Sequence, residues 1–172
     1  MSRPSKKEKK SPYQTRREEL GLSREKASEL LETIPPERIE RIENGKFAAY
    51  PDEVVTMAEK YKAPQLCNYY CAHECSIGKK YVPEVKIKDL SQIVLEMLNS
   101  LNLMRKRQER LIEITVDGYI QKDEINDFVD IQEQLEKISL MVETLQLWAE
   151  QKIASGAIDL VEYEAVKERR RK

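Results

Sequence analysis

The chain has 172 residues, of which 35% are charged and 6% aromatic, and its 30 basic and 31 acidic side chains leave a net charge of −1. This composition is typical of a highly solvated helical protein of one or two domains, and it argues against a compact enzyme with a deep apolar pocket. The balanced charge excludes a generally basic nucleic-acid coat. No apolar run approaches the ~18 residues of a membrane helix, no signal peptide is visible, and the three cysteines are interpreted as reduced thiols. We therefore expect a cytoplasmic protein that does not enter a membrane.

Residues 1–11 are rich in lysine and have no apolar periodicity, which predicts a disordered basic arm. Arms of this kind often contact DNA phosphates or the minor groove. A solubilising tail is an equally good interpretation of the same composition.

Five short helical segments are expected between residues 12 and 78, because turn and cap residues divide this stretch. Gly21 and Gly45 can stop helices, Ser23 is a good N-cap, and Pro51 suits a first helical turn. These signals predict a small helical domain over residues 12–78. Residues 79–88, in which Pro83 blocks a helix, are expected to form an extended linker.

The second half of the chain changes to long amphipathic segments over residues 89–115 and 122–155. Apolar residues recur there at steps of three and four, and Asp117-Gly118 supplies a turn between the segments. The pattern predicts an antiparallel helical hairpin, followed by a short helix capped by Asp159 and a basic tail. On the first helix the expected apolar seam contains Leu90, Val94, Met97, Leu101, Met104 and Leu111.

The apolar stripe of this hairpin is wider than one seam, so two helices alone are too thin to bury it. A second copy of the chain is the simplest cover, and it would give a homodimer with a four-helix core. The alternative is that the hairpin folds back over the first domain. The residues expected in the dimer contact are Leu101, Met104, Leu135, Ile138, Val142, Leu145 and Trp148.

The stretch "IPPERIERIENGK", residues 34–46, has the pattern of a short exposed helix. Pro36 fits the first helical position, where its missing N–H costs nothing. Ile39 and Ile42 are expected to face inward. Helical spacing then turns Glu37, Arg38 and Arg41 outward near the N-terminal end, where a helix can meet base edges in a major groove.

The two segments "LGLSREKASELL" and "RIERIENGK" together resemble the helix-turn-helix domain of the lambda-repressor/Cro family, also called the XRE family. The resemblance covers residues 13 to about 75, and its most specific stretch is Ile39 to Lys46. It implies an all-α fold in which a five-helix DNA-binding domain precedes the hairpin. It also implies a sequence-specific transcriptional regulator, expected to be a repressor, that binds double-stranded DNA.

Residue roles follow from the resemblance position by position. Glu43 and Arg17 match a structural ion pair. The positions matching phosphate contacts are Arg24, Asn44 and Lys46. The positions matching base reading or groove lining are Pro36, Glu37, Arg38 and Arg41, of which arginine can fork onto guanine and glutamate can accept from cytosine. The chain departs from the family at Glu32, where a small residue or glycine is usual, and at Pro36, where a polar side chain is usual.

Two other motifs suggest metal sites but fit them poorly. Cys67, Cys71 and Cys75 lie on one helical face with a single histidine in the whole chain, and they are better interpreted as buried thiols than as zinc ligands. Residues 113–124 have some spacing of a calcium loop but lack its first and third acidic ligands. We expect no metal, no cofactor and no small-molecule substrate.

No combination of residues typical of a catalytic site is present, so an enzyme is not expected. The alternative to a DNA-binding regulator is a repurposed helix-turn-helix protein that acts as a protein-binding adaptor or inhibitor, for example a phage-encoded antagonist, with the acidic hairpin as its binding surface. The weakly basic third helix and Pro36 favour that alternative.

Overall fold

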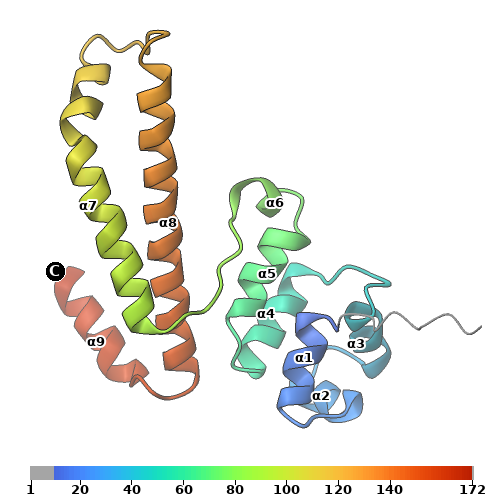
Figure 1. The fold of residues 1–172 in the computed structure, drawn as a ribbon. Helices are drawn as coiled ribbons and strands as arrows, with labels where there is room; N and C mark the ends of the chain where they lie inside the picture. The colour runs from blue at the N-terminus through green and yellow to red at the C-terminus, as the bar shows by residue number, and fades with distance from the viewer. Residues whose placement is uncertain (1–9, 172) are drawn as a thin grey trace, which may run out of the picture. The chain divides into compact units, whose positions relative to one another are not determined.

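The computed structural model describes residues 10–171, and within that range it contains nine helices and no strand (Figure 1). The all-α class expected from the sequence is confirmed. Most of the expected basic arm, residues 1–9, lies outside the described residues, as does residue 172. The chain divides into two compact units, Met1–Glu84 with Gln151–Lys172, and Val85–Glu150. The division differs from the expected 89–172 unit, because the last segment groups with the N-terminal part.

The first unit begins with five helices whose starts are set by local chemistry. At α1 and α2 the cap hydroxyls of Ser11 and Ser23 each accept a hydrogen bond from a backbone N–H at 3.2 Å. Proline occupies the start of α1, α3 and α4, where no N–H is needed. The helices are α1 (Pro12–Glu19), α2 (Arg24–Leu31), α3 (Pro36–Glu43), α4 (Pro51–Lys60) and α5 (Gln65–His73).

One apolar core holds these helices together. Ile39 and Ile42 of α3 are 1% and 3% exposed, so the inward face expected for this helix is confirmed. The other members come from the four other helices and from three connections, and they are Tyr13, Ala27, Leu31, Ile34, Ala49, Val54, Met57, Ala58, Tyr61, Ala63 and Leu66. Because α3 buries one side in this core, its opposite side is left for other contacts.

The expected extended linker is partly helical. A short helix, α6 (Gly78–Tyr81), occupies its start, and the chain is non-helical only from Val82 to Asp89. Glycine is required at the start of α6, because a Cβ on Gly78 would lie 2.1 Å from the carbonyl oxygen of Cys71. This close approach lets α6 pack directly against α5.

The second unit is built on two long helices, α7 (Leu90–Thr115) and α8 (Ile125–Ala154), which run antiparallel (Figure 1). In the turn between them Gly118 has φ +76°, and the carboxylate of Asp117 accepts from the N–H of Tyr119 at 3.0 Å. Past α8, Asp159 caps the last helix, α9 (Leu160–Arg171), by accepting from the N–H of Val161 at 2.8 Å. None of the helices within residues 10–171 has the length and apolar character needed to cross a bilayer.

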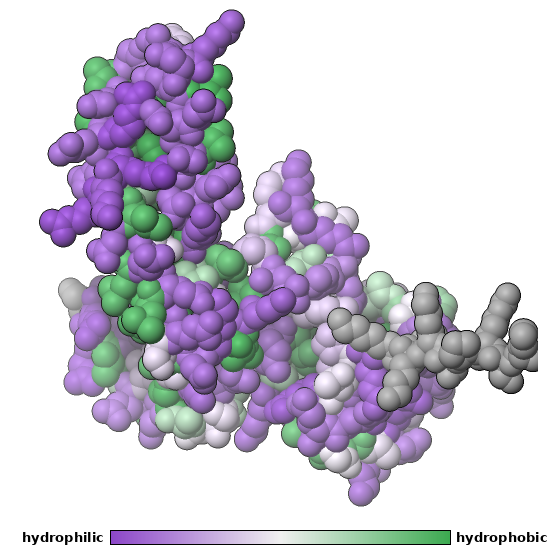
Figure 2. Space-filling view, viewed as in Figure 1, coloured by the Kyte–Doolittle hydropathy of each residue, from purple (hydrophilic) through white to green (hydrophobic). Residues whose placement is uncertain are grey.

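The seam of the hairpin on α7 differs in part from the expected one. Ile93, Ser100 and Ile114 are buried and the expected Met97, Met104 and Leu111 are half-buried, whereas the expected Leu90, Val94 and Leu101 are 39–45% exposed. Two neighbouring stripes of α7 are apolar, so periodicity alone does not decide which of them faces α8. The remaining exposed apolar side chains interrupt the hydrophilic surface along the hairpin (Figure 2).

The connection between α2 and α3 is strained. Glu32 has φ 62° and ψ −44°, and the N–H of Thr33 donates to the carbonyl of Leu31 at 2.6 Å, which makes a γ-turn in its disfavoured hand. This is the position at which the chain departs from the helix-turn-helix pattern of small residues or glycine. The side chain of Glu32 pairs with Lys60 at 2.8 Å but is 71% exposed, so that pair contributes little.

Substituting Glu32→Gly should therefore stabilise the protein. Removing the Cβ relieves a backbone strain of about 1–2 kcal/mol, and the greater freedom of glycine in the unfolded chain offsets about half of that. We expect the free energy of unfolding in urea to rise by about 0.5–1 kcal/mol. Glu32→Gln is the matched control, because it removes the charge pair and keeps the Cβ. A glycine variant less stable than the glutamine variant would contradict this account.

Candidate nucleic-acid interface

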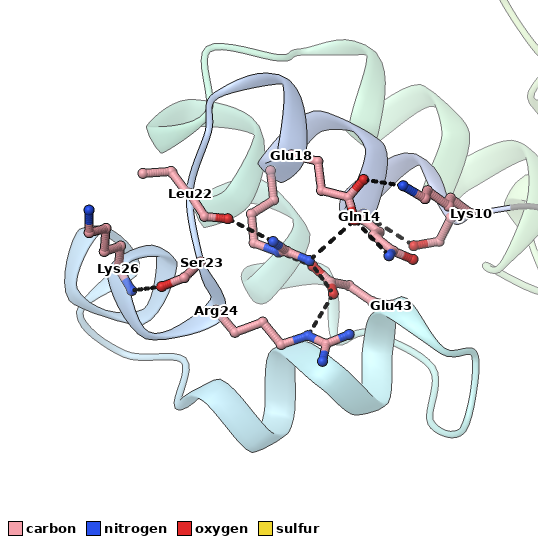
Figure 3. A network of polar contacts seen from close by, with 10 residues as sticks. Lys10, Gln14, Glu18, Leu22, Ser23, Arg24, Lys26 and Glu43 are labelled. Carbon is pink, nitrogen blue, oxygen red and sulfur yellow. Dashed lines mark hydrogen bonds and ion pairs between the residues drawn. The ribbon is translucent and has the colours of Figure 1, made fainter.

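A buried cluster of one carboxylate and two guanidinium groups joins α1, α2 and α3 (Figure 3). Arg17 donates Nε and Nη2 to the two carboxylate oxygens of Glu43, at 2.5 and 2.9 Å. Arg24 donates Nε to Oε2 of the same carboxylate at 2.9 Å. Arg17 and Glu43 are 7% and 4% exposed, so this pairing is shielded from water. The ion pair implied by the family resemblance is thus present in the structure.

The cluster also fixes the path of the chain into α2. The second terminal nitrogen of Arg17, Nη1, donates to the carbonyl of Leu22 at 2.7 Å, so one side chain holds both α3 and the α1–α2 turn. The hydrogen bond to Glu43 raises the pKa of Arg17 above its ordinary value, which keeps the guanidinium charged. A buried pair of this kind fixes the relative position of the helices that contribute it.

Arg24 lies at the start of α2, where a phosphate contact is expected, but its guanidinium also has a partner within the domain. Its side chain is about one-third exposed and is turned toward Glu43, where Nε is engaged. Its two terminal nitrogens lie away from that bond at the start of α2 (Figure 3). A phosphate contact by Arg24 would have to use those nitrogens while the inner bond is kept.

Arg38 does not project outward, which corrects its expected role as a base reader. Its Nε and Nη2 donate to the carboxylate of Glu53 at 2.7 Å each, and Nη2 also donates to the carbonyl of Ala48 at 2.9 Å. The guanidinium carbon lies 4.7 Å from the centre of the Tyr50 ring, and the side chain is only 18% exposed. Arg38 therefore fastens α3 to the start of α4.

Glu53 also caps α4, and this second bond fixes its carboxylate beside Arg38. One of its oxygens accepts from the backbone N–H of Tyr50 at 2.7 Å. Burial on its own would raise the pKa of Glu53, but the hydrogen bonds from Arg38 and Tyr50 outweigh it, and the pKa lies below its ordinary value. Spacing within α3 could not reveal this contact, because the partner lies fifteen residues along the chain.

The outward face of α3 is the stripe of Glu37, Arg41 and Asn44, three residues exposed at helical spacing. The guanidinium of Arg41 lies 5.5 Å from the ring centre of Phe47, in the loop after α3. Asn44 donates to Glu40 at 3.3 Å, and Pro36 is half-buried at the start of the helix. Of the expected groove residues, Glu37 and Arg41 keep their outward position.

The loop after α3 adds groups that the sequence interpretation missed. Phe47 and Tyr50 are 57% and 67% exposed, and each lies against an arginine of α3. Lys46 is exposed in the same loop. Two aromatic residues within five positions after the helix-ending Gly45 were the signal in the sequence that could have located this surface.

The three cysteines of the expected helical face and the loop of residues 113–124 were weighed as metal sites, and the structure shows contacts of a different kind for Cys75 and Asp117. Cys67, Cys71 and Cys75 are half-buried, and the N–H of Gly78 donates to the sulfur of Cys75 at 3.4 Å. Within residues 10–171 no group of three or more His, Cys, Asp or Glu side chains is arranged to hold a metal ion. The Asp117 carboxylate is engaged in its own turn.

Comparison of the chain with protein-family models, with curated proteins and with solved structures found no match.

Neutralising the buried carboxylate should destabilise the first unit strongly. In a Glu43→Gln variant two guanidinium groups keep their charge and lose their counter-ion, which costs about 3–5 kcal/mol for a buried pair. Glu40→Gln, on the same helix, is the matched control because Glu40 accepts a hydrogen bond from the exposed Asn44 rather than from a buried arginine, and it should cost under about 0.5 kcal/mol. Urea unfolding followed by circular dichroism measures both. Equal losses in the two variants would show that the buried cluster does not fix the helices.

The lowered pKa of Glu53 predicts a specific pH dependence. Its contribution to stability is complete above the unfolded carboxyl pKa of about 4.5 and is lost as the pH falls through the lower folded pKa. Glu53→Gln should therefore be less stable than the parent chain at pH 7, and the gap should narrow below about pH 4. Unfolding midpoints measured at pH 7, 5 and 3.5 test this. A gap that does not change with pH would rule out the linkage.

Proposed function

We propose that this chain is a sequence-specific DNA-binding transcriptional regulator, acting as a repressor, in which α2 and α3 form a helix-turn-helix. The observation that carries the proposal is the outward stripe of α3, Glu37, Arg41 and Asn44, on a helix that the buried Arg17–Glu43–Arg24 cluster holds beside α2. The resemblance of residues 13–75 to the lambda-repressor/Cro family supports the same assignment.

The dimensions of α3 suit this role. An α-helix with its side chains is about 10–12 Å across, so the major groove of B-DNA, about 12 Å wide, admits one helix, and the eight residues of α3 extend about 12 Å along it. With α3 in the groove, Arg41 is the side chain that would form a bidentate pair with guanine, and Glu37 would accept from cytosine. Arg38 is not expected to contact a base, because its guanidinium is bonded to Glu53.

The flanking groups would set the position of the protein on the duplex. Lys46 follows α3 in an exposed loop, and Arg24 lies at the start of α2 with its outer nitrogens unused by the buried pair. These cations would contact phosphates on either side of the groove, which contributes affinity and orientation rather than sequence choice. If the chain is a homodimer, two such units would read half-sites about 34 Å apart.

A protein-binding adaptor or inhibitor is the second candidate, and the exposed Phe47 and Tyr50 favour it. Aromatic residues and arginine are enriched where proteins meet, and both aromatics here lie beside an arginine. The carboxylates of Glu37 and Glu40 on α3 also make this surface less basic than most DNA-reading helices. The two candidates differ in their response to salt.

Selection from random double-stranded DNA by the full chain, followed by mobility shifts at several salt concentrations, separates the candidates. A regulator should enrich one sequence and bind it with a steep loss of affinity as salt rises. The adaptor should enrich nothing and fail to bind DNA even at low salt.

Arg41 and Lys46 should affect DNA binding in different ways. Arg41→Ala should weaken the selected site by about 5- to 150-fold and relax the choice of one base, because a bidentate contact is lost. Lys46→Ala should weaken all sequences about equally and reduce the salt slope by about one. Lys122→Ala, which removes the same charge from the exposed hairpin turn, is the control and should change nothing. If Arg41→Ala binds the selected site as the parent chain does, α3 does not read DNA through Arg41.

A further inference from the structure

The α7–α8 hairpin has two unlike flanks, and one of them is almost free of charge. On α7, Val94 and Leu101 each follow a buried seam residue, and Leu98 lies further outward on the same side. On α8, Leu135 and Val142 follow the seam residues in the same way. Because both helices are right-handed and antiparallel, residues that follow the seam emerge on one common side of the pair.

We call this side the uncharged flank. On α7 it contains Ser91, Val94, Leu98, Leu101, Arg105, Gln108 and Ile112, and on α8 it contains Ile125, Phe128, Gln132, Leu135, Ser139, Val142, Gln146 and Ala149. Among these described positions Arg105 is the single charged residue, in a chain of which 35% is charged. A solvated helical surface in such a chain would carry several charges of each sign.

Large apolar side chains on the uncharged flank are about half exposed. The exposed fractions are 40% for Val94, 52% for Leu98, 45% for Leu101, 47% for Leu135 and 42% for Val142. They lie at matching levels of the two helices, so they form one continuous surface rather than scattered residues. Contiguous exposed apolar surface on a hairpin with this composition indicates a contact surface.

The opposite flank has different chemistry. Glu96 pairs with Lys88 at 2.6 Å, and Arg110 pairs with Asp127 at 2.6 Å across the two helices. Thr144, on the same side of α8, is 2% exposed. This flank is charged, ion-paired and partly covered, so it has no comparable open apolar surface.

We propose that the uncharged flank is the docking surface for a second copy of this chain, in a two-fold symmetric four-helix contact. A surface with a single charge gives a strongly charged partner little to attract, whereas two copies of it meet with little like-charge repulsion. The inference does not depend on the DNA-binding proposal, since it concerns the second unit alone.

The size of the surface agrees with a dimer contact. From Val94 to Ile112, α7 extends about 27 Å at 1.5 Å per residue, and two adjacent helices are about 20 Å wide. The flank therefore offers about 500 Å² on each copy, or about 1,000 Å² in total, which is the lower bound for a specific interface.

The lone charge also fits a two-fold arrangement. With the axis near Leu98 and Ser139, at the centre of the apolar residues, Arg105 lies one to two helical turns away. The two symmetry-related guanidinium groups then point toward opposite ends of the contact, more than a Debye length of about 8 Å apart.

This surface revises the dimer contact expected from the sequence. Leu101, Leu135 and Val142 of that set are exposed on the uncharged flank and keep their expected role. The other four, Met104, Ile138, Leu145 and Trp148, are half-buried in the described chain, and spacing places them on the seam between α7 and α8. They stabilise the hairpin itself.

Light scattering of the full chain over a range of concentrations tests the proposal. The parent chain should have the mass of two 20.2 kDa copies. Leu101→Lys should raise the dimer dissociation constant at least about 100-fold, because it places an unpaired charge in the centre of the contact. Leu95→Lys is the matched control: Leu95 is 68% exposed on the back of α7, so this variant should remain a dimer.

Leu135→Lys makes the same test from α8, in case one variant fails to fold, and circular dichroism verifies the helical content of each. Conversion of either flank variant to a monomer with unchanged helicity supports the proposal. A monomeric parent chain at tens of micromolar, or well-folded flank variants that dimerise as the parent does, would overturn it. DNA binding by the first unit could survive that result, so the two proposals fail separately.

Discussion

The arrangement of α1, α2 and α3 depends on one carboxylate that is removed from water. Glu43 receives hydrogen bonds from Arg17 and Arg24, and Arg17 extends the same network to the α1–α2 turn. A buried charge that loses its partner is costly, so the three helices are tied to a single geometry. Every function suggested for α3 relies on this, because a helix can present a fixed pattern of side chains only if its own position is fixed.

A second arginine–glutamate contact also restricts the position of α3. Arg38 and Glu53 fasten α3 to α4, while the apolar core fills the space beneath. Between them the two contacts use the inner and one lateral side of α3, and the stripe of Glu37, Arg41 and Asn44 remains exposed to a partner. The contacts made by the other residues of α3 thus determine which side of this short helix is exposed.

The helices were predictable from sequence because their signals are local. Ser23 and the prolines at 12, 36 and 51 act within one turn of the chain, and the first four of the five expected helices begin at or next to these residues. Arg17 and Glu43 could be paired only through the family resemblance, since 26 residues separate them. The contacts of Arg38 and the close approach at Gly78 depend on atoms outside their own turns, the Glu53 carboxylate and the Cys71 carbonyl, which local signals do not reveal.

The seam of the hairpin shows a second limit of prediction from sequence. Ile93 and Val94 are adjacent, similar in size and both part of an apolar stripe, so sequence cannot say which is buried. The structure buries Ile93 fully and leaves Val94 40% exposed. A shift of one residue along the sequence rotates the buried face of a helix by about 100°, and this decides which residues remain on the outside of a helical pair.

The dual use of Glu53 means that the chemistry displayed by α3 is partly encoded outside α3. A substitution of Glu53 in α4 would remove two of the three hydrogen bonds of Arg38 with the sequence of α3 unchanged, and would leave the Ala48 carbonyl and the Tyr50 ring as its contacts. The cap of α4 would be lost in the same step, so the freedom of an α3 side chain and the thermal tolerance of the unit are coupled through one residue.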